Sequence, residues 1–409
     1  MSKGTFLVLL LIAFNVIVAQ NADSLKIKEL EKRIQILEEK MQKNELKELI
    51  NKAEEKATEK TIEKKDVVFK SGQRSLQAIN PEISVTGDMF AQYSEQKINK
   101  FLRNGFIFRG LGFHIASALD PFSTMKAAIS VNPYGVEFGE AYVTWHDVLP
   151  RLSITAGKFR QQFGVINRWH VHALDQADFP LALTTILGED GLNQIGVSFD
   201  WLMPAITANA NELTLQITNG QSEQLFSGEA FSFPSVLVHL KNYYDINENT
   251  YFEFGLTGLY GKNTSENNSD ILHNTYVGGA DFTLNWEPVN RAHYNMFELR
   301  CELYYADKKI DEGEITAFGG YVYGQYKFNE FITAGVRLDA TQPFSLENKG
   351  DYLYQVSPYL TWEQSHWVKL RLQYNWLNNN FNSLNPEFSN DTARLQIVFA
   401  VGPHKHDRY

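Results

Sequence analysis

Apolar and polar residues alternate with a period of two along most of the chain beyond residue 80. In the segment 331–341, Val336 and Leu338 fall on one face of an extended chain, and Arg337 and Asp339 fall on the other. This alternation predicts strands that are apolar on one side and polar on the other. A soluble β-sandwich would show the same period, so the alternation alone does not fix the fold class.

About sixteen such segments follow one another along the chain. They lie at 83–93, 105–119, 124–132, 136–147, 152–163, 191–201, 206–217, 232–243, 250–261, 273–286, 293–306, 317–328, 331–341, 351–362, 367–377 and 391–401. An even number of alternating segments is typical of outer-membrane β-barrels, in which one face contacts lipid and the other faces water. We therefore expect an all-β transmembrane protein, an outer-membrane barrel of about 16 antiparallel strands over residues 81–409, in contact with outer-membrane lipids.

The connections differ between the two ends of this barrel. If the first strand rises from the periplasm, the periplasmic connections are all short: 120–123, 147–150, 202–204, 245–249, 287–292, 329–330 and 363–365. The opposite connections are longer and polar, apart from 132–135: they are 94–104, 164–190, 218–231, 263–272, 307–316, 342–350 and 378–390. Short turns at one rim and long loops at the other are the expected asymmetry of this architecture.

Aromatic residues make up 13% of the chain, and several lie near the ends of expected strands. Aromatic side chains form girdles at the two interfaces of outer-membrane barrels. We assign to these girdles Tyr243, Tyr244, Tyr304, Tyr305, Tyr321, Tyr323, Tyr326, Trp362 and Trp367.

The first 80 residues have a different pattern. The apolar run within residues 1–19 predicts a signal peptide, and no later apolar run is long enough for a spanning helix. Residues 20–66 are rich in Lys and Glu, with apolar residues at alternating spacings of three and four: Ile27, Leu30, Ile34, Leu37 and Met41. This seam predicts a periplasmic coiled coil that joins copies of the chain, and its Ile and Leu order favours a dimer. A single solvated helix is the alternative. Residues 67–80 are then a linker.

One long connection, 164–190, contains both polar and apolar residues. A loop of this length in a compact domain is usually functional or disordered, and this one carries too many apolar residues for a solvated linker. We expect it to fold back into the barrel and constrict the pore. Its candidate constriction residues are Arg168, His170, His172, Asp175, Asp178, Glu189 and Asp190.

His170 and His172 are two residues apart. In an extended backbone both imidazoles point the same way and can chelate one ion, with Asp175 and Asp178 as further oxygen ligands. Histidine with carboxylate suits a divalent metal such as zinc. The alternative is that the two histidines make ordinary hydrogen bonds that hold the loop against the wall.

The alternation also assigns charged residues to the lumen: Arg300, Arg337, Lys369 and Arg371 among the bases, and Glu253, Glu298, Glu302 and Asp339 among the acids. Acids outnumber bases after the coiled coil, and rings of Asp and Glu favour cations, so we expect a weak cation preference.

The composition also excludes several classes of protein. The formal charge is −10 and no basic patch is interleaved with aromatic residues, so we expect no nucleic-acid partner. The one cysteine excludes an internal disulfide framework. Neither a GxSxG elbow nor an HExxH pair is present, so we do not expect an enzyme.

These features resemble the Gram-negative outer-membrane porins, in which general porins place their constriction loop between strands five and six. The coiled coil before PEISVTGDMFAQY resembles the layout of phosphate-selective-type porins. The segments NRWHVHALDQADFP and LGEDGLNQIGVSFDWLMP and the ending GPHKHDRY are similar to a porin-like family of largely unassigned substrate, some members of which are labelled zinc-regulated. The resemblance covers most of residues 80–409, and its RWHxHxL stretch is its most specific part.

The resemblance implies a passive diffusion channel in the outer membrane for small hydrophilic solutes or ions. It also implies a homo-oligomer, since porins are commonly trimers, whereas the coiled coil favours a dimer. Two alternatives remain open: a channel that binds zinc or a similar metal, and a non-conducting anchor or adhesin whose coiled coil reaches peptidoglycan.

Overall fold

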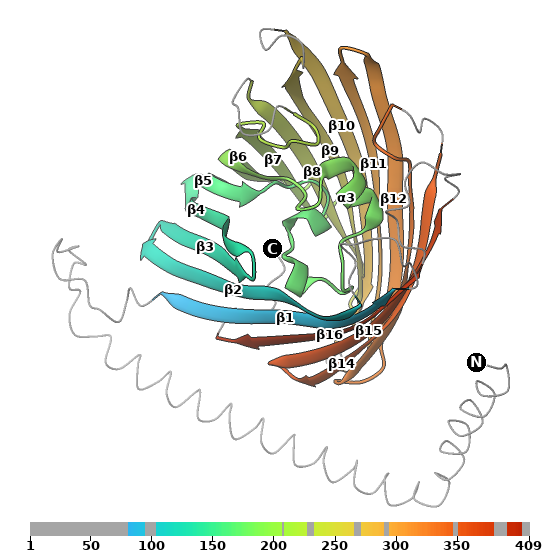
Figure 1. Cartoon of the computed structure of the whole chain (residues 1–409). Coiled ribbons are helices and arrows are strands. Elements are labelled where there is room, and N and C mark those ends of the chain that lie inside the picture. Colours follow the sequence, from blue (N-terminus) through green and yellow to red (C-terminus); the bar gives the residue numbers. More distant parts are fainter. Residues whose placement is uncertain are drawn as a thin grey trace, which may run out of the picture. The chain divides into compact units, whose positions relative to one another are not determined.

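The computed structural model describes residues 81–94, 104–206, 208–226, 233–265, 271–289, 294–346, 351–379 and 391–402. The expected signal peptide, coiled coil and linker lie outside the described residues. Within them, sixteen strands form one closed antiparallel barrel (Figure 1). Each strand pairs with its neighbours in the sequence, and β1 pairs with β16 to close the barrel. The expected sixteen-stranded antiparallel barrel is confirmed.

The strands run as follows: β1 Glu82–Ser94, β2 Gly105–Asp120, β3 Ser123–Asn132, β4 Gly135–Leu149, β5 Leu152–Arg160, β6 Asn193–Met203, β7 Ala210–Thr218, β8 Ser235–Asn247, β9 Thr250–Thr264, β10 Leu272–Trp286, β11 Met296–Ile310, β12 Gly313–Lys327, β13 Ile332–Thr341, β14 Leu353–Ser365, β15 Val368–Asn379 and β16 Asp391–Val401.

The two faces of the strands match the alternation in the sequence. On β13, Val336 and Leu338 are 41% and 47% exposed, whereas Arg337 and Asp339 are fully or almost fully buried. In a closed barrel with an apolar exterior, the exposed apolar side chains form the lipid-facing surface and the buried polar ones face the lumen. The lumen is therefore filled at this level, because a water-filled bore would leave Arg337 accessible.

One expected loop is wrong. β11 continues to Ile310 and β12 begins at Gly313, so a two-residue turn replaces the loop expected at 307–316. The ladder continues through this polar stretch, with Lys309 paired to Glu314. The physical reason is that a barrel strand can extend beyond the lipid belt into water, where polar side chains do not end it.

Part of the aromatic girdle assignment is also wrong. Tyr304, Tyr321 and Tyr323 are at most 3% exposed and belong to the internal apolar core. Tyr305 and Trp362, by contrast, are 47% and 43% exposed, as expected for the outer surface. Residue type alone does not give the face of a strand.

The long connection between β5 and β6 lies inside the barrel (Figure 1). It spans residues 161–192 and contains two short 3₁₀ turns, η1 (Ile166–Arg168) and η2 (Val171–Ala173), and the helix α3 (Leu181–Leu187). The helix lies against β11, β12 and β13. No helix among the described residues is long and apolar enough to cross a membrane. We call residues 161–192 the internal loop.

Candidate functional site

An apolar core fixes the internal loop to one side of the lumen. Ile166, Leu174, Leu183, Ile186 and Leu187 are all at most 1% exposed. They belong to one cluster with residues of the wall, among them Leu237, Leu259, Tyr304, Tyr321 and Tyr323. Full burial of one such aliphatic side chain stabilises a structure by about 1.5–3 kcal/mol. The internal loop is therefore a packed element of the fold.

A second connection, which the sequence analysis did not single out for this role, also folds inward. Leu225 is fully buried and Phe226 is 4% exposed, both within the same apolar core. The side-chain amide of Gln224 donates to the backbone carbonyl of Thr185 in α3 at 2.8 Å. Residues 224–226, in the described part of the connection between β7 and β8, therefore pack against the internal loop.

Arginines of the wall bind the internal loop. Arg371 donates to the backbone carbonyls of Leu174 and Gln176 at 2.8 and 2.7 Å. The Arg300 guanidinium lies 4.6 Å from the centre of the Trp169 ring. Arg300, Arg337 and Arg371 face the lumen as the alternation predicted, but all three are at most 6% exposed. They bind the internal loop or are buried beneath it, whereas Lys369, near the start of β15, is half-buried.

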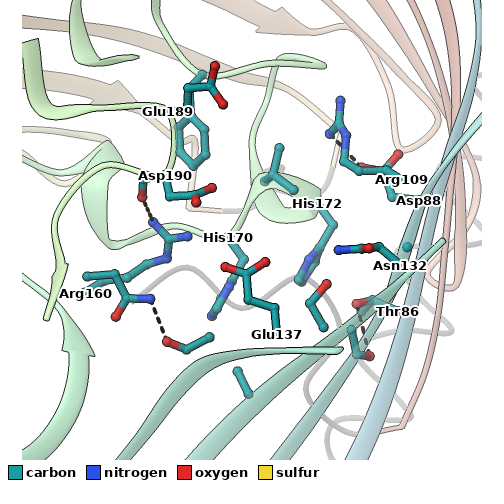
Figure 2. A pocket seen from close by; sticks show the side chains of 18 of the residues that line it. Thr86, Asp88, Arg109, Asn132, Glu137, Arg160, His170, His172, Glu189 and Asp190 are labelled. Carbon is teal, nitrogen blue, oxygen red and sulfur yellow. Dashed lines mark hydrogen bonds and ion pairs between the residues drawn. The ribbon is translucent and has the colours of Figure 1, made fainter. Parts of the chain in front are cut away.

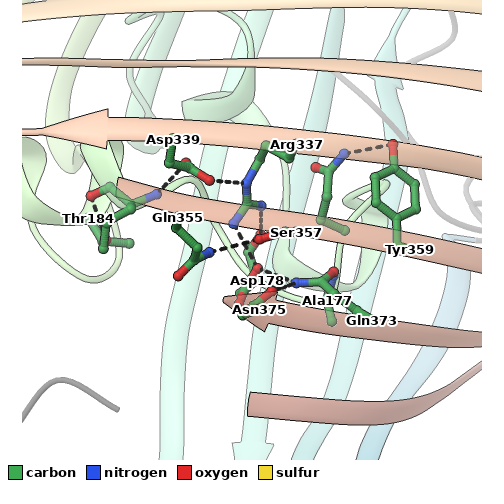
Figure 3. Close-up of polar contacts among 12 residues, drawn as sticks. Ala177, Asp178, Thr184, Arg337, Asp339, Gln355, Ser357, Tyr359, Gln373 and Asn375 are labelled. Carbon is green, nitrogen blue, oxygen red and sulfur yellow. Dashed lines mark hydrogen bonds and ion pairs between the residues drawn. The ribbon is translucent and has the colours of Figure 1, made fainter. Parts of the chain in front are cut away.

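The carboxylate of Asp178, in the internal loop, contacts side chains of β13 and β15 (Figure 3). Arg337 and Arg394 form ion pairs with its carboxylate, and the side-chain amides of Gln373 and Asn375 donate to it. Burial alone raises the pKa of the Asp178 carboxyl. The two guanidinium groups and the two amides outweigh burial and hold this pKa well below its ordinary value.

Glu302, on β11, binds the start of the internal loop. Its Oε1 accepts the backbone N–H groups of Val165 and Ile166 at 3.0 and 2.9 Å. Its Oε2 accepts the hydroxyl of Tyr304 at 2.5 Å. The lumen acids Glu302 and Asp339, like the lumen arginines, are therefore used to hold the internal loop, since Asp339 accepts the backbone N–H of Leu181 at 2.8 Å.

A cavity of about 530 Å³ remains between the internal loop and the wall formed mainly by β1 to β5 (Figure 2). Its polar lining consists of Thr86, Asp88, Arg109, His114, Ser130, Asn132, Glu137, Arg160, His170, His172, Asp178, Thr184, Glu189, Asp190, Asn193 and Gln355. Five of the seven predicted constriction residues line it: His170, His172, Asp178, Glu189 and Asp190.

The other two predicted constriction residues do not line the cavity. The Asp175 carboxylate accepts the hydroxyl of Tyr323 at 3.0 Å, so Asp175 faces the wall. Arg168 donates to the side chain of Gln162 at 2.7 Å. Arg168 ends the 3₁₀ turn η1, and Asp175 follows the turn η2. The role of all seven residues in constricting the pore stays a prediction.

Two β-bulges shape the wall of the cavity. Arg109 is the extra residue where β2 pairs with β1, and Gly139 is the extra residue where β4 pairs with β3. Bulges re-aim side chains and often lie beside functional sites. Arg109 faces the lumen, where it pairs with Asp88 at 2.8 Å, and the shift of the alternation after it turns His114 toward the lumen as well.

The charges around the cavity fall into two groups. Arg109 is paired with Asp88, and Arg160 donates to the backbone carbonyl of Asp190 at 2.7 Å. The carboxylates of Glu137, Glu189 and Asp190 are exposed. Within the described part of the chain, none of these three forms an ion pair within 4.0 Å. The lining therefore presents net negative charge.

Three histidines meet at the cavity. His114, on β2, joins His170 and His172 of the internal loop, with ring centroids 5.0, 5.0 and 5.5 Å apart. Glu140, on β4, forms a hydrogen bond with His170, with 2.9 Å between Glu140 Oε2 and His170 Nε2. Sequence reasoning missed His114 and Glu140, because the pairing of a strand with a distant loop leaves no local signal.

No group of three His, Cys, Asp or Glu side chains among the described residues is placed so that it could hold a metal ion. Asp175 and Asp178, the oxygen ligands considered for a zinc site, are bound elsewhere. Zinc binding by His170 and His172 therefore stays a prediction.

No protein-family model matches the chain. An uncharacterized protein of Aquifex aeolicus (strain VF5) is 24% identical over 318 residues, which are 75% of this chain and 62% of that protein. The match thus spans less than two thirds of that relative's length.

Solved structures of outer-membrane proteins are similar to this chain. An anion-selective porin from Comamonas acidovorans has a TM-score of 0.55 at 11% identity, covering 79% of this chain and 100% of that one. The outer membrane channel DcaP of Acinetobacter baumannii has a TM-score of 0.55 at 12% identity, covering 81% and 99%. OmpT of Vibrio cholerae, in a trimer form, has a TM-score of 0.53 at 10% identity, covering 79% and 100%. The chain has the fold of the outer-membrane porins. The narrower resemblance through RWHxHxL stays a prediction.

Proposed function

We propose that the protein is an outer-membrane diffusion channel for small hydrophilic solutes, with a preference for cations. The porin fold and the lumen cavity between the internal loop and β1 to β5 support a channel. The internal loop occupies the opposite side of the lumen, so solutes pass along the cavity.

The cation preference is proposed from which charged side chains of the lumen are buried and which are exposed. The arginines Arg337, Arg371 and Arg394 bind the internal loop, so their charges are not offered to a passing anion. Glu137, Glu189 and Asp190 are exposed on the cavity instead. Carboxylates that line a pore favour cations.

The test is a planar bilayer recording on the purified full chain under a KCl gradient. We expect steady ohmic steps and a reversal potential that shows K⁺ to be more permeant than Cl⁻. The triple variant Glu137→Gln, Glu189→Gln, Asp190→Asn is expected to lose most of this preference and keep its conducting steps.

A matched triple variant replaces exposed glutamates away from the cavity, Glu248, Glu312 and Glu330, by Gln. It has the same change in net charge and is expected to keep the preference of the parent. Anion preference in the parent would overturn the cation proposal. Silent bilayers from folded protein would favour the anchor or adhesin.

We also propose that the channel assembles with copies of itself. One similar structure, OmpT of Vibrio cholerae, is described as a trimer form, and the coiled-coil pattern of residues 20–66 favours self-association. Mass measurement of the detergent-solubilised chain, with and without residues 20–66, separates a dimer from a trimer and a monomer.

A further inference from the structure

The fold brings three imidazoles into the same cavity as the exposed carboxylates. His114 comes from β2, and His170 and His172 come from the internal loop, 56 and 58 residues further along the chain. Their ring centroids lie within 5.5 Å of one another (Figure 2 shows His170 and His172). A cation that enters this cavity therefore meets nitrogen ligands as well as oxygen ligands.

These two ligand types distinguish classes of cation. Carboxylate oxygens attract any cation, and Mg²⁺ and Ca²⁺ are bound almost entirely by oxygen. Imidazole nitrogen suits first-row transition metals and zinc. A cavity with Glu137, Glu189 and Asp190 alone would not separate zinc from magnesium, whereas the added imidazoles would.

Glu140 prepares one of the imidazoles for this role. The backbone N–H of Arg160 donates to Glu140 Oε1 at 2.9 Å, and Glu140 Oε2 lies 2.9 Å from His170 Nε2. An ionised carboxylate only accepts, so a neutral His170 carries its proton on Nε2 and its lone pair on Nδ1. A carboxylate behind a histidine in this way orients the ring of a metal ligand.

The arrangement of these side chains suits a metal ion that passes through the cavity better than one that stays bound in it. No three His, Cys, Asp or Glu side chains in the described ranges could hold an ion together, and the His170 and His172 rings are nearly parallel, at 10°. Conduction requires sites that attract an ion yet hold it weakly enough to let it leave. Partial sites in succession meet this requirement, and a closed tetrahedral site would not.

We infer that the channel carries divalent first-row metal ions such as Zn²⁺ as cargo, with the carboxylates collecting them and His114, His170 and His172 selecting them. This inference rests on the proposed cation channel and names its substrate class.

The first experiment measures block of the K⁺ current in planar bilayers by ZnCl₂ and by MgCl₂. A permeant ion that binds more strongly than K⁺ reduces the K⁺ current. In the parent, half-block by Zn²⁺ is expected at a concentration about tenfold or more below that of Mg²⁺, because imidazole prefers zinc. The double variant His114→Asn, His172→Asn is expected to lose this difference, with block by each metal measured relative to the variant's own metal-free K⁺ current. His170 is left in place because it binds Glu140.

The control variant is His273→Asn. His273 also pairs with a carboxylate, Asp311 at 2.7 Å, but it does not line the cavity. It is expected to keep the zinc preference of the parent. Equal block by both metals in the parent, or a zinc preference that survives in the double variant, would overturn the inference. The K⁺ current itself tests the proposed channel, so the two failures are distinguishable.

The second experiment separates passage from block. Proteoliposomes that contain a zinc-sensitive dye are diluted into ZnCl₂, and the rate of the dye signal is compared between parent and double variant. Zinc entry that is several-fold faster in the parent supports the inference. Zinc that blocks the K⁺ current and does not enter would overturn it.

Discussion

Arg337 and Asp178 join the barrel wall to the internal loop through two contacts. One terminal nitrogen of Arg337 donates to the backbone carbonyl of Asp178 at 2.8 Å, and the other donates to its carboxylate at 3.0 Å. The Arg337 side chain is fully buried. An arginine that faces the lumen is thus a structural residue here, because its charge is paired with Asp178 of the internal loop and with Asp339 of its own strand.

This pairing predicts how stability depends on pH. Asp178→Asn is expected to lower the free energy of unfolding at pH 7 by about 3 kcal/mol. It removes the carboxylate that pairs with both Arg337 and Arg394, and leaves Arg337 with its ion pair to Asp339 alone. The folded-state pKa of Asp178 lies below its unfolded value. The stabilisation is therefore complete above about pH 4 and is lost only as the pH falls through the lower, folded-state pKa.

The measurement is the unfolding temperature of parent and Asp178→Asn in detergent at a series of pH values from 7 to 3. The difference in unfolding temperature between parent and variant is expected to stay constant down to about pH 4 and to decrease below it. Asp190→Asn, an exposed carboxylate on the same loop, is the control and should show little gap. A gap that already closes between pH 7 and 5 would contradict the low pKa.

The apolar core predicts a second result. Leu183→Ala removes a fully buried side chain of α3 and is expected to cost about 2–5 kcal/mol. Hydrogen exchange of the internal loop should become more than about tenfold faster, since 1.4 kcal/mol is a factor of ten. Leu181→Ala is the matched control, because Leu181 is half-buried and lines the cavity. Equal effects of the two substitutions would show that the core does not hold the loop.

The sequence predicted the barrel and its faces because a period of two survives folding. Arg337 and Arg371 face the lumen as their neighbours on the strand require. The same rule, counted from Glu302, would have placed Tyr304 correctly, because Tyr304 lies two residues after Glu302 and shares its face. Assigning it to a girdle by residue type was the error.

The candidate site was less predictable from the sequence. The internal loop was recognisable from its length and apolar content, but its partners were not. The bulge at Arg109 shifts the alternation of β2 by one residue, so His114 cannot be given a face by counting from the start of the strand. The contact between His114 and His170 joins residues 56 positions apart and exists only in the folded chain.

The third prediction concerns the charge left on the wall when the internal loop is removed. Deleting residues 164–190, with a short Gly-Ser link in their place, removes four carboxylates and one arginine, a formal change of +3. It also uncovers Arg300, Arg371 and Arg394, which bind or underlie the loop in the intact protein. The pore should become wider and, because uncovered arginines attract anions, more permeant to Cl⁻.

Single-channel recording of this deletion in a KCl gradient should show higher conductance and a reversal potential shifted toward Cl⁻. The double variant Glu189→Gln, Asp190→Asn separates the two effects. It lowers the negative charge at the cavity but keeps the loop in place, so its cation preference should fall while its conductance stays near that of the parent. If the deletion leaves conductance unchanged, the internal loop does not constrict the pore. A wider pore that keeps its full cation preference would contradict the expectation that the uncovered arginines attract anions. Arg300 has a wall acid nearby, Glu298 at 3.7 Å, so Arg371 and Arg394 carry this expectation.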